Sequence, residues 1–182
     1  MGASWKVYWN EYGNEAYLYG SEIAFHAKDD VEFKNELMPP GSIIKRWFSK
    51  VNYQSMQIEP TLPMIDGEGR YHISLDASAE PADGLLLKLI FYDRYDLEAG
   101  SQIVRDGEAD FQCPLKTFSY ELQLINAGTA QFHFHFIMIR EIEDGEQETL
   151  LHIKESKKRK ARGKRAKRRR SKAENRRVPQ PH

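Results

Sequence analysis

Residues 131–142 read Gln-Phe-His-Phe-His-Phe-Ile-Met-Ile-Arg-Glu-Ile, and their alternation indicates the secondary structure on which the chain is built. From Phe132 to Met138 every second residue is apolar, and His133 and His135 lie between. A side-chain period of two is typical of a β-strand that buries one face and exposes the other. This stretch therefore predicts a long, half-buried strand with its even-numbered apolar residues on the buried face.

The same period recurs along the chain, at residues 21–26, 31–34, 71–76 and 118–124. Residues 85–95 are more continuously apolar, which predicts a central strand covered on both faces. About eight to ten short strands separated by turns predict an all-β fold, either a β-sandwich or a jelly-roll-like domain.

Turn-forming residues separate these segments. Asp106-Gly107 stands between residues 101–105 and 108–113, which predicts a two-residue β-hairpin. Asp144-Gly145 predicts a second hairpin, between residues 131–142 and 148–153. Residues 126–129, Asn-Ala-Gly-Thr, predict a turn between two long strands.

Opposite charges divide the chain into two parts, although its formal net charge is zero. Residues 154–177 contain fifteen of the 27 basic residues and two of the 27 acidic ones, which leaves 12 basic and 25 acidic residues elsewhere. Residues 156–177 include nothing apolar that is larger than alanine, so burial cannot offset the entropy of ordering them. The sequence therefore predicts an acidic β-sandwich domain over residues 1–153 and a disordered polybasic tail over residues 154–182.

The chain carries none of the common catalytic or cofactor-binding motifs: no nucleophile elbow, no glycine-rich phosphate loop and no Cys-x-x-Cys pair. Cys113 is the single cysteine, which excludes an internal disulfide and suits a reducing compartment. The first residues lack the apolar region of a signal peptide, and no apolar run reaches the roughly 20 residues of a membrane span. We expect a non-enzymatic, cytoplasmic protein that needs no metal or cofactor.

His133 and His135 are the best candidates for a metal site, because residues i and i+2 of a strand share a face. A third ligand would have to come from another strand, such as Glu121 or His72. With Glu121, the two histidines would form a hydrolase site on a jelly-roll scaffold. Alternation alone explains both histidines as the polar face of an amphipathic strand, and we favour that interpretation.

Aromatic residues crowd the first twenty positions and recur later in the chain. Flat rings exposed on a sandwich can stack on sugars, although sandwich cores also use many aromatic residues. The candidate contacts for a glycan or a partner protein are Trp9, Tyr12, Trp47 and Tyr95.

The tail contains two blocks of four consecutive basic residues, which can bind phosphate groups on lipid or nucleic acid. The candidate contacts with an anionic surface are Lys157, Lys158, Arg159, Lys160, Lys167, Arg168, Arg169 and Arg170. Aromatic residues that would stack on bases do not alternate with these charges. Anionic membrane, an acidic protein surface and nucleic acid all remain open as partners, and a nucleic-acid-associated protein is the alternative function.

Several stretches of the chain resemble a known family. They are residues 8–13 (Tyr-Trp-Asn-Glu-Tyr-Gly), 17–21, 38–41, 84–93 and 119–128. Together they span most of residues 5–142, and they resemble the third accessory secretory protein of the bacterial accessory Sec system. They form strands and turns, and they include no catalytic signature.

This resemblance implies a carbohydrate-binding-module-like fold and a non-catalytic role in a three-protein complex of Gram-positive bacteria. That complex assists the export of serine-rich-repeat glycoprotein adhesins, and its other two members resemble a glycosyltransferase and an esterase-like acetyltransferase. The expected partners are these accessory Sec subunits, the accessory motor ATPase and the glycosylated adhesin. The expected location is cytoplasmic, with peripheral membrane association through the basic tail.

Overall fold

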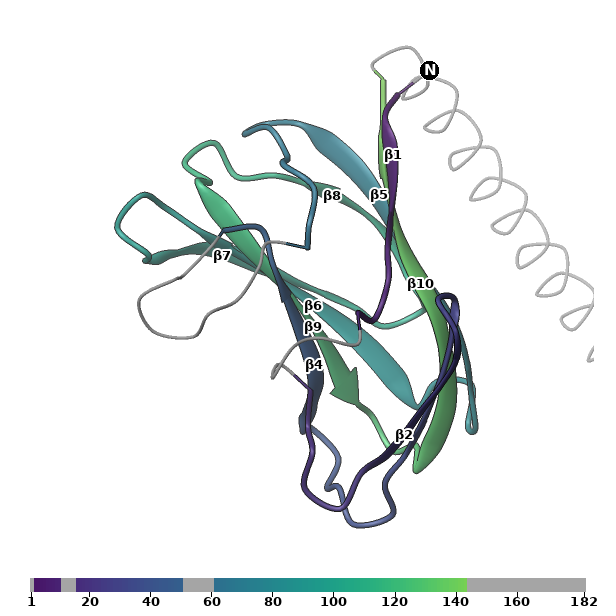
Figure 1. The fold of residues 1–182 in the computed structure, drawn as a ribbon. Coiled ribbons are helices and arrows are strands. Elements are labelled where there is room, and N and C mark those ends of the chain that lie inside the picture. The colour runs from purple at the N-terminus through teal and green to yellow at the C-terminus, as the bar shows by residue number, and fades with distance from the viewer. Residues whose placement is uncertain (1, 11–15, 51–60, 144–182) are drawn as a thin grey trace, which may run out of the picture. The chain divides into compact units, whose positions relative to one another are not determined.

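A computed structural model describes residues 2–10, 16–50 and 61–143. These residues form ten β-strands in two antiparallel sheets, drawn in Figure 1. The larger sheet has the order β2 (Glu22–Ala27), β3 (Asp30–Lys34), β10 (Gln131–Glu141), β5 (Arg70–Ala79) and β8 (Glu108–Gln112), with β1 (Ser4–Val7) also pairing with β10. The smaller sheet has the order β4 (Ile43–Phe48), β9 (Ser119–Asn126), β6 (Leu85–Tyr92) and β7 (Glu98–Val104).

One hydrophobic core joins the inward faces of the two sheets. Its members from the larger sheet include Phe33 and Ile73, and those from the smaller sheet include Leu89 and Leu122, all fully buried. The prediction of an all-β sandwich is confirmed for the described residues. They contain no helix that is long and apolar enough to cross a membrane.

Strand β10 confirms the alternating pattern over its first half and departs from it over the second. Phe132 and Phe134 are buried, but Ile137 and Ile139 replace Phe136 and Met138 on the inward face. The cause is a β-bulge between Phe134 and Phe136, where the pairing with β5 shifts. An extra residue in one strand reverses which side chains face the core, so the period of two continues with the opposite parity.

The connection at Asp106-Gly107 is a tight turn, but the hairpin prediction is wrong. Strand β7 before the turn pairs with β6, and strand β8 after it pairs with β5. Gly107 has a φ of 77°, a left-handed conformation that glycine adopts without strain. The turn therefore carries the chain from the smaller sheet to the larger one. Residues 126–129 make another crossing between the sheets, from β9 to β10.

The predicted central strand over residues 85–95 is β6, an inner strand of the smaller sheet that ends at Tyr92. It ends there because Asp93 Oδ1 accepts the backbone N–H groups of Tyr95 and Leu97, which folds residues 93–97 into a turn. The inward face of β6 is buried. On the outward face Ile90 is also buried, whereas Leu86, Lys88 and Tyr92 are half-buried. The strand is thus central in its sheet, and its outward face is only partly covered.

The compact sandwich comprises Met1–Ile142. The predicted boundary at residue 153, the hairpin at Asp144-Gly145 and the polybasic tail lie outside the described residues.

Candidate binding surfaces

Two of the four aromatic residues predicted to bind a glycan or a partner lie in the core. Trp9 is 2% exposed and Trp47 is 1% exposed. Trp47 Nε1 donates a hydrogen bond of 2.9 Å to the Tyr8 carbonyl, and the Trp9 ring packs edge-on against Phe134. The prediction that these two indoles form an exposed surface is wrong, because both are buried and are among the largest side chains of the core.

Tyr95 is 84% exposed, so it remains available for contact, whereas Tyr12 lies outside the described residues. Tyr95 belongs to a group of exposed apolar side chains at one end of the sandwich, which we call the apolar rim. The apolar rim consists of Met64, Tyr95, Leu97, Leu115 and Phe118, all more than half exposed.

Three loops carry the apolar rim, and hydrogen bonds to their backbone hold them together. The Phe118 N–H donates to the Tyr92 carbonyl, which joins residues 113–118 to the turn after β6. The Glu68 N–H donates to the Cys113 carbonyl, and the Tyr120 hydroxyl donates to the Pro63 carbonyl at 2.6 Å, which joins residues 61–69 to the same end. The loops that carry the rim residues therefore meet at one end of the sandwich, although they are separated in sequence.

The metal and hydrolase hypotheses fail on geometry. His133 lies on the larger sheet, with Nδ1 2.9 Å from Asp30 Oδ1, while Glu121 lies on the smaller sheet. His72 pairs with Arg140, far along β10 from His133, and its Nδ1 is 2.7 Å from Asp110 Oδ1. Within the described ranges, no group of three or more histidine, cysteine or acidic side chains is arranged to hold a metal ion.

Histidines and carboxylates do form a polar cluster on the outward face of β2, β3 and β10. His26 Nε2 lies 3.0 Å from Glu32 Oε2, and the His26 and His133 rings stack with centroids 6.2 Å apart. The hydrogen bond with Glu32 raises the pKa of His26 against the opposing effect of desolvation. The bond with His26 lowers the pKa of Glu32, and that with His133 lowers the pKa of Asp30.

A second polar cluster, centred on Glu121, occupies the outward face of the smaller sheet. Glu121 is 5% exposed; its carboxylate accepts hydrogen bonds from the Tyr92 hydroxyl at 3.0 Å and from Gln123 Nε2 at 2.7 Å. Arg46 Nε lies 3.5 Å from the same carboxylate. Burial and the Glu121 bond raise the pKa of Tyr92 to about 12. Sequence reasoning missed this network, since alternation places Glu121 outward but does not show that its neighbours bury it.

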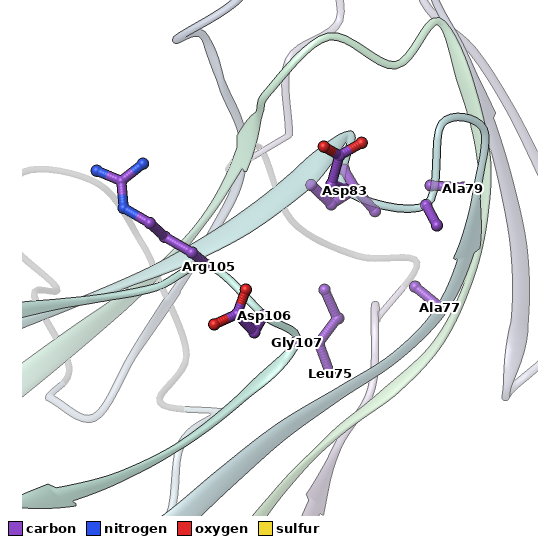
Figure 2. A pocket seen from close by; sticks show the side chains of 9 residues that line it. Leu75, Ala77, Ala79, Asp83, Arg105, Asp106 and Gly107 are labelled. Carbon is purple, nitrogen blue, oxygen red and sulfur yellow. The ribbon is translucent and has the colours of Figure 1, made fainter. Parts of the chain in front are cut away.

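A cavity of about 310 Å³ opens beside the distal half of β5 (Figure 2). Leu75, Ala77 and Ala79 of β5 form one wall, and Leu85 of β6 contributes apolar surface. The loop after β5 adds Ala82 and Asp83, and the turn between β7 and β8 adds Arg105, Asp106 and Gly107. No sequence motif marked this cavity, because its residues come from two strands and two connections that are separated in sequence.

The eight basic residues predicted to contact an anionic surface lie outside the described residues. Their role stays a prediction.

These surfaces belong to an antiparallel β-sandwich module with an apolar rim at one end and a cavity at one sheet edge. Comparison with known proteins then places the chain in a family: residues 16–141 match the family model described as Accessory Sec secretory system ASP3. The chain belongs to this family, the third accessory secretory proteins of the accessory Sec system, which confirms the resemblance seen in its sequence.

A member of the family from Streptococcus gordonii is 36% identical over 146 residues, covering 75% of this chain and 92% of that protein. Two solved structures, both 31% identical with a TM-score of 0.71, are also similar. One is a complex of accessory secretory proteins 1, 2 and 3 in Streptococcus pneumoniae, where the match covers 76% of this chain and 96% of that chain. The other is the Glycosylation Associate Protein (Gap123) complex from Streptococcus agalactiae.

The match to the Streptococcus agalactiae structure covers 77% of this chain but only 45% of that chain. A xylan-binding CBM22-1 domain from Paenibacillus barcinonensis is 12% identical with a TM-score of 0.41, a likeness of fold alone.

Proposed function

We propose that this protein is a non-catalytic subunit of the accessory Sec protein export complex. The observation that carries the proposal is family membership over residues 16–141, together with the 31% identical relative solved in a complex of accessory secretory proteins 1, 2 and 3. The subunit works in the cytoplasm by binding the other two accessory proteins. It assists the transport of glycosylated serine-rich-repeat adhesins to the membrane, with the accessory motor ATPase as a further partner.

The apolar rim is the surface that we assign to a partner subunit. Met64 is 90% exposed, and four more large apolar side chains surround the same end. Contiguous exposed apolar side chains are uncommon on monomeric proteins and mark interaction sites. A stable protein contact buries about 800 Å² on each partner, so the rim would form its centre and not its whole extent. Polar groups lie beside the apolar rim. Lys50 Nζ is 3.2 Å from Asp96 Oδ1 and 5.3 Å from the centroid of the Phe118 ring.

Among the predicted aromatic contacts that the structure describes, Tyr95 is the one exposed for glycan recognition, because the core holds Trp9 and Trp47. Tyr95 lies in the rim, so one surface would serve either a glycan or a partner subunit. We assign it to the partner, since aliphatic neighbours such as Leu97 and Leu115 offer no hydrogen bonds to sugar hydroxyls.

The test is co-purification with the other two accessory secretory proteins. We expect Leu97→Asp and Phe118→Asp to abolish co-purification, because a carboxylate at the centre of an apolar contact is costly to desolvate. The matched control is Leu37→Asp: Leu37 is 73% exposed and lies in the loop before β4, at the opposite end of the sandwich. Complexes that survive both rim substitutions would remove the rim as the interface. A wild-type chain that never co-purifies would refute the subunit role itself.

A further inference from the structure

Within the part of the chain that the structure describes, the last four residues of β5 have a neighbouring strand on one side only. Residues 71–79 of β5 pair with β10 on one side, but on the other side β8 pairs only with residues 70–74. On that side, the pairing ends with a hydrogen bond of 2.7 Å that the Leu75 N–H donates to the Gly107 carbonyl. Beyond it the chain turns away to β7, so no strand within the described ranges pairs with that side of residues 76–79.

The alternation of a strand indicates which backbone groups face this open edge. Leu75 directs its N–H toward β8, and residues two and four positions further on direct theirs to the same side. Ala77 and Ala79 thus present N–H and C=O groups to the edge of β5 that lies beyond the end of its pairing with β8. Unpaired backbone groups on a strand edge form a template for a further strand.

The cavity of about 310 Å³ lies at this open edge. In Figure 2, Ala77 and Ala79 lie along one side of it and Asp83 lies above, while the Arg105 guanidinium is directed away from both alanines. The walls from Leu75, the alanines and Leu85 are apolar. An added strand would direct every second side chain into this space.

We propose that the open edge of β5 is a binding site for an extended segment of another polypeptide, which adds a strand beside residues 76–79. Four residues of strand span about 13 Å, so the segment is short. Its inward side chains are apolar and fill the cavity. In the bound segment, a basic residue follows these apolar residues, because Asp83 and Asp106 contribute two carboxylates to the lining of the cavity. This site is separate from the apolar rim and does not depend on the proposed export function.

The test uses the full chain, labelled with ¹⁵N, and a synthetic peptide of alternating serine and valine that ends in lysine. We expect amide shift changes centred on Ala77, Ala79 and Gly107, and binding that weakens as salt rises. The same peptide with N-methylated backbone amides should not bind, because it cannot donate hydrogen bonds to β5. Absent shifts, shifts elsewhere on the sandwich, or equal binding of the N-methylated peptide would each overturn the proposal.

A pair of variants tests the cavity itself. Ala77→Leu fills it and should weaken peptide binding at least about tenfold, while Ser78→Leu places the same side chain on the opposite, exposed face and should leave binding unchanged. Amide spectra of both variants check that they fold. If a folded Ala77→Leu variant binds as tightly as the wild type, the cavity is not the site. Because the assay contains no accessory subunit, its failure would leave the co-purification result untouched.

Discussion

The Tyr92 hydroxyl donates a hydrogen bond of 3.0 Å to the buried carboxylate of Glu121, across the β6–β9 pair of the smaller sheet. The two residues are not directly opposite: Tyr92 pairs with Ser119, and Glu121 pairs with Ile90. Diagonal neighbours on one sheet face are within reach of long side chains. This bond, with those from Gln123 and Arg46, satisfies a carboxylate that would otherwise be costly to bury.

We expect Tyr92→Phe to lower the free energy of unfolding by about 1.5–3 kcal/mol at pH 7, since a hydrogen bond to a charged group is lost. Urea denaturation measures the change. Tyr95→Phe is the matched control, because its hydroxyl is exposed and should contribute less than about 0.5 kcal/mol. A Tyr92→Phe variant as stable as the wild type would show that the bond contributes nothing.

The same residue predicts behaviour at high pH. The pKa of Tyr92 is raised to about 12 in the folded chain, against an ordinary value near 10. A raised pKa contributes stability that is present below the ordinary value and is lost as pH rises toward the folded value. Between pH 10 and 12, stability should therefore fall more steeply for the wild type than for Tyr92→Phe. Parallel curves would contradict the assignment.

Burial of the two indoles predicts large losses of stability. Trp9→Ala and Trp47→Ala should each cost about 3–5 kcal/mol, because each leaves a cavity in the shared core. Thermal and urea denaturation measure the effect, with Tyr95→Ala as an exposed aromatic control. Acrylamide should quench Trp9 and Trp47 weakly in the folded chain. Strong quenching of either residue would place it at the surface after all.

The polar cluster on the larger sheet predicts that its contribution to the stability of the fold is largest within a limited range of pH. The raised pKa of His26 stabilises the fold at low pH and the effect is lost as pH rises through the folded value. The lowered pKa values of Glu32 and Asp30 act in the opposite sense, stabilising above their ordinary values and losing the effect as pH falls. For the His26–Glu32 pair, the two effects overlap between the ordinary pKa of Glu32, 4.5, and that of His26, 6.5.

We therefore expect the difference in Tm between the wild type and His26→Asn to be largest near pH 5–6 and to shrink by pH 8. Calorimetry across this range measures it. Glu32→Gln should reproduce the profile, because it removes the other partner of the same bond. A difference that stays constant with pH would mean that charge pairing is not the cause.

The basic tail predicts binding to anionic vesicles. Basic residues near an anionic membrane contribute about 1 kcal/mol each, and salt screens the attraction. Liposome flotation should recover the full chain and not a chain truncated after residue 153. Replacing Lys157–Lys160 with glutamine, or residues 167–170 likewise, should each remove part of the binding. Equal flotation of the truncated chain would exclude the tail as an anchor, and competition by RNA at low salt would favour the nucleic-acid alternative.

Sequence alternation predicted where the strands lie. It did not predict which side chains of β10 face the core beyond the bulge in that strand. The strict alternation of Phe and His ends at Phe136, because residues 136–139 are all apolar, and the sequence there does not decide which of them face inward. The bulge places Ile137 and Ile139 in the core in place of Phe136 and Met138. A bulge is a property of two paired strands, so it cannot be read from one of them. The candidate site shows the same limit. Trp47 and Tyr95 are both aromatic residues near strand ends, but tertiary packing buries Trp47 and leaves Tyr95 exposed, and the sequence does not distinguish the two.

Local residue order was enough to establish the strands, the glycine turn at Gly107, the split of charge between body and tail, and the family resemblance, because each depends on neighbours along the chain. The assignment of β7 and β8 to different sheets, the burial of Glu121 and the open edge beside Ala77 came from the folded molecule. Those features arise from backbone pairing between residues far apart in sequence, and no local pattern encodes which distant strand will supply the partner.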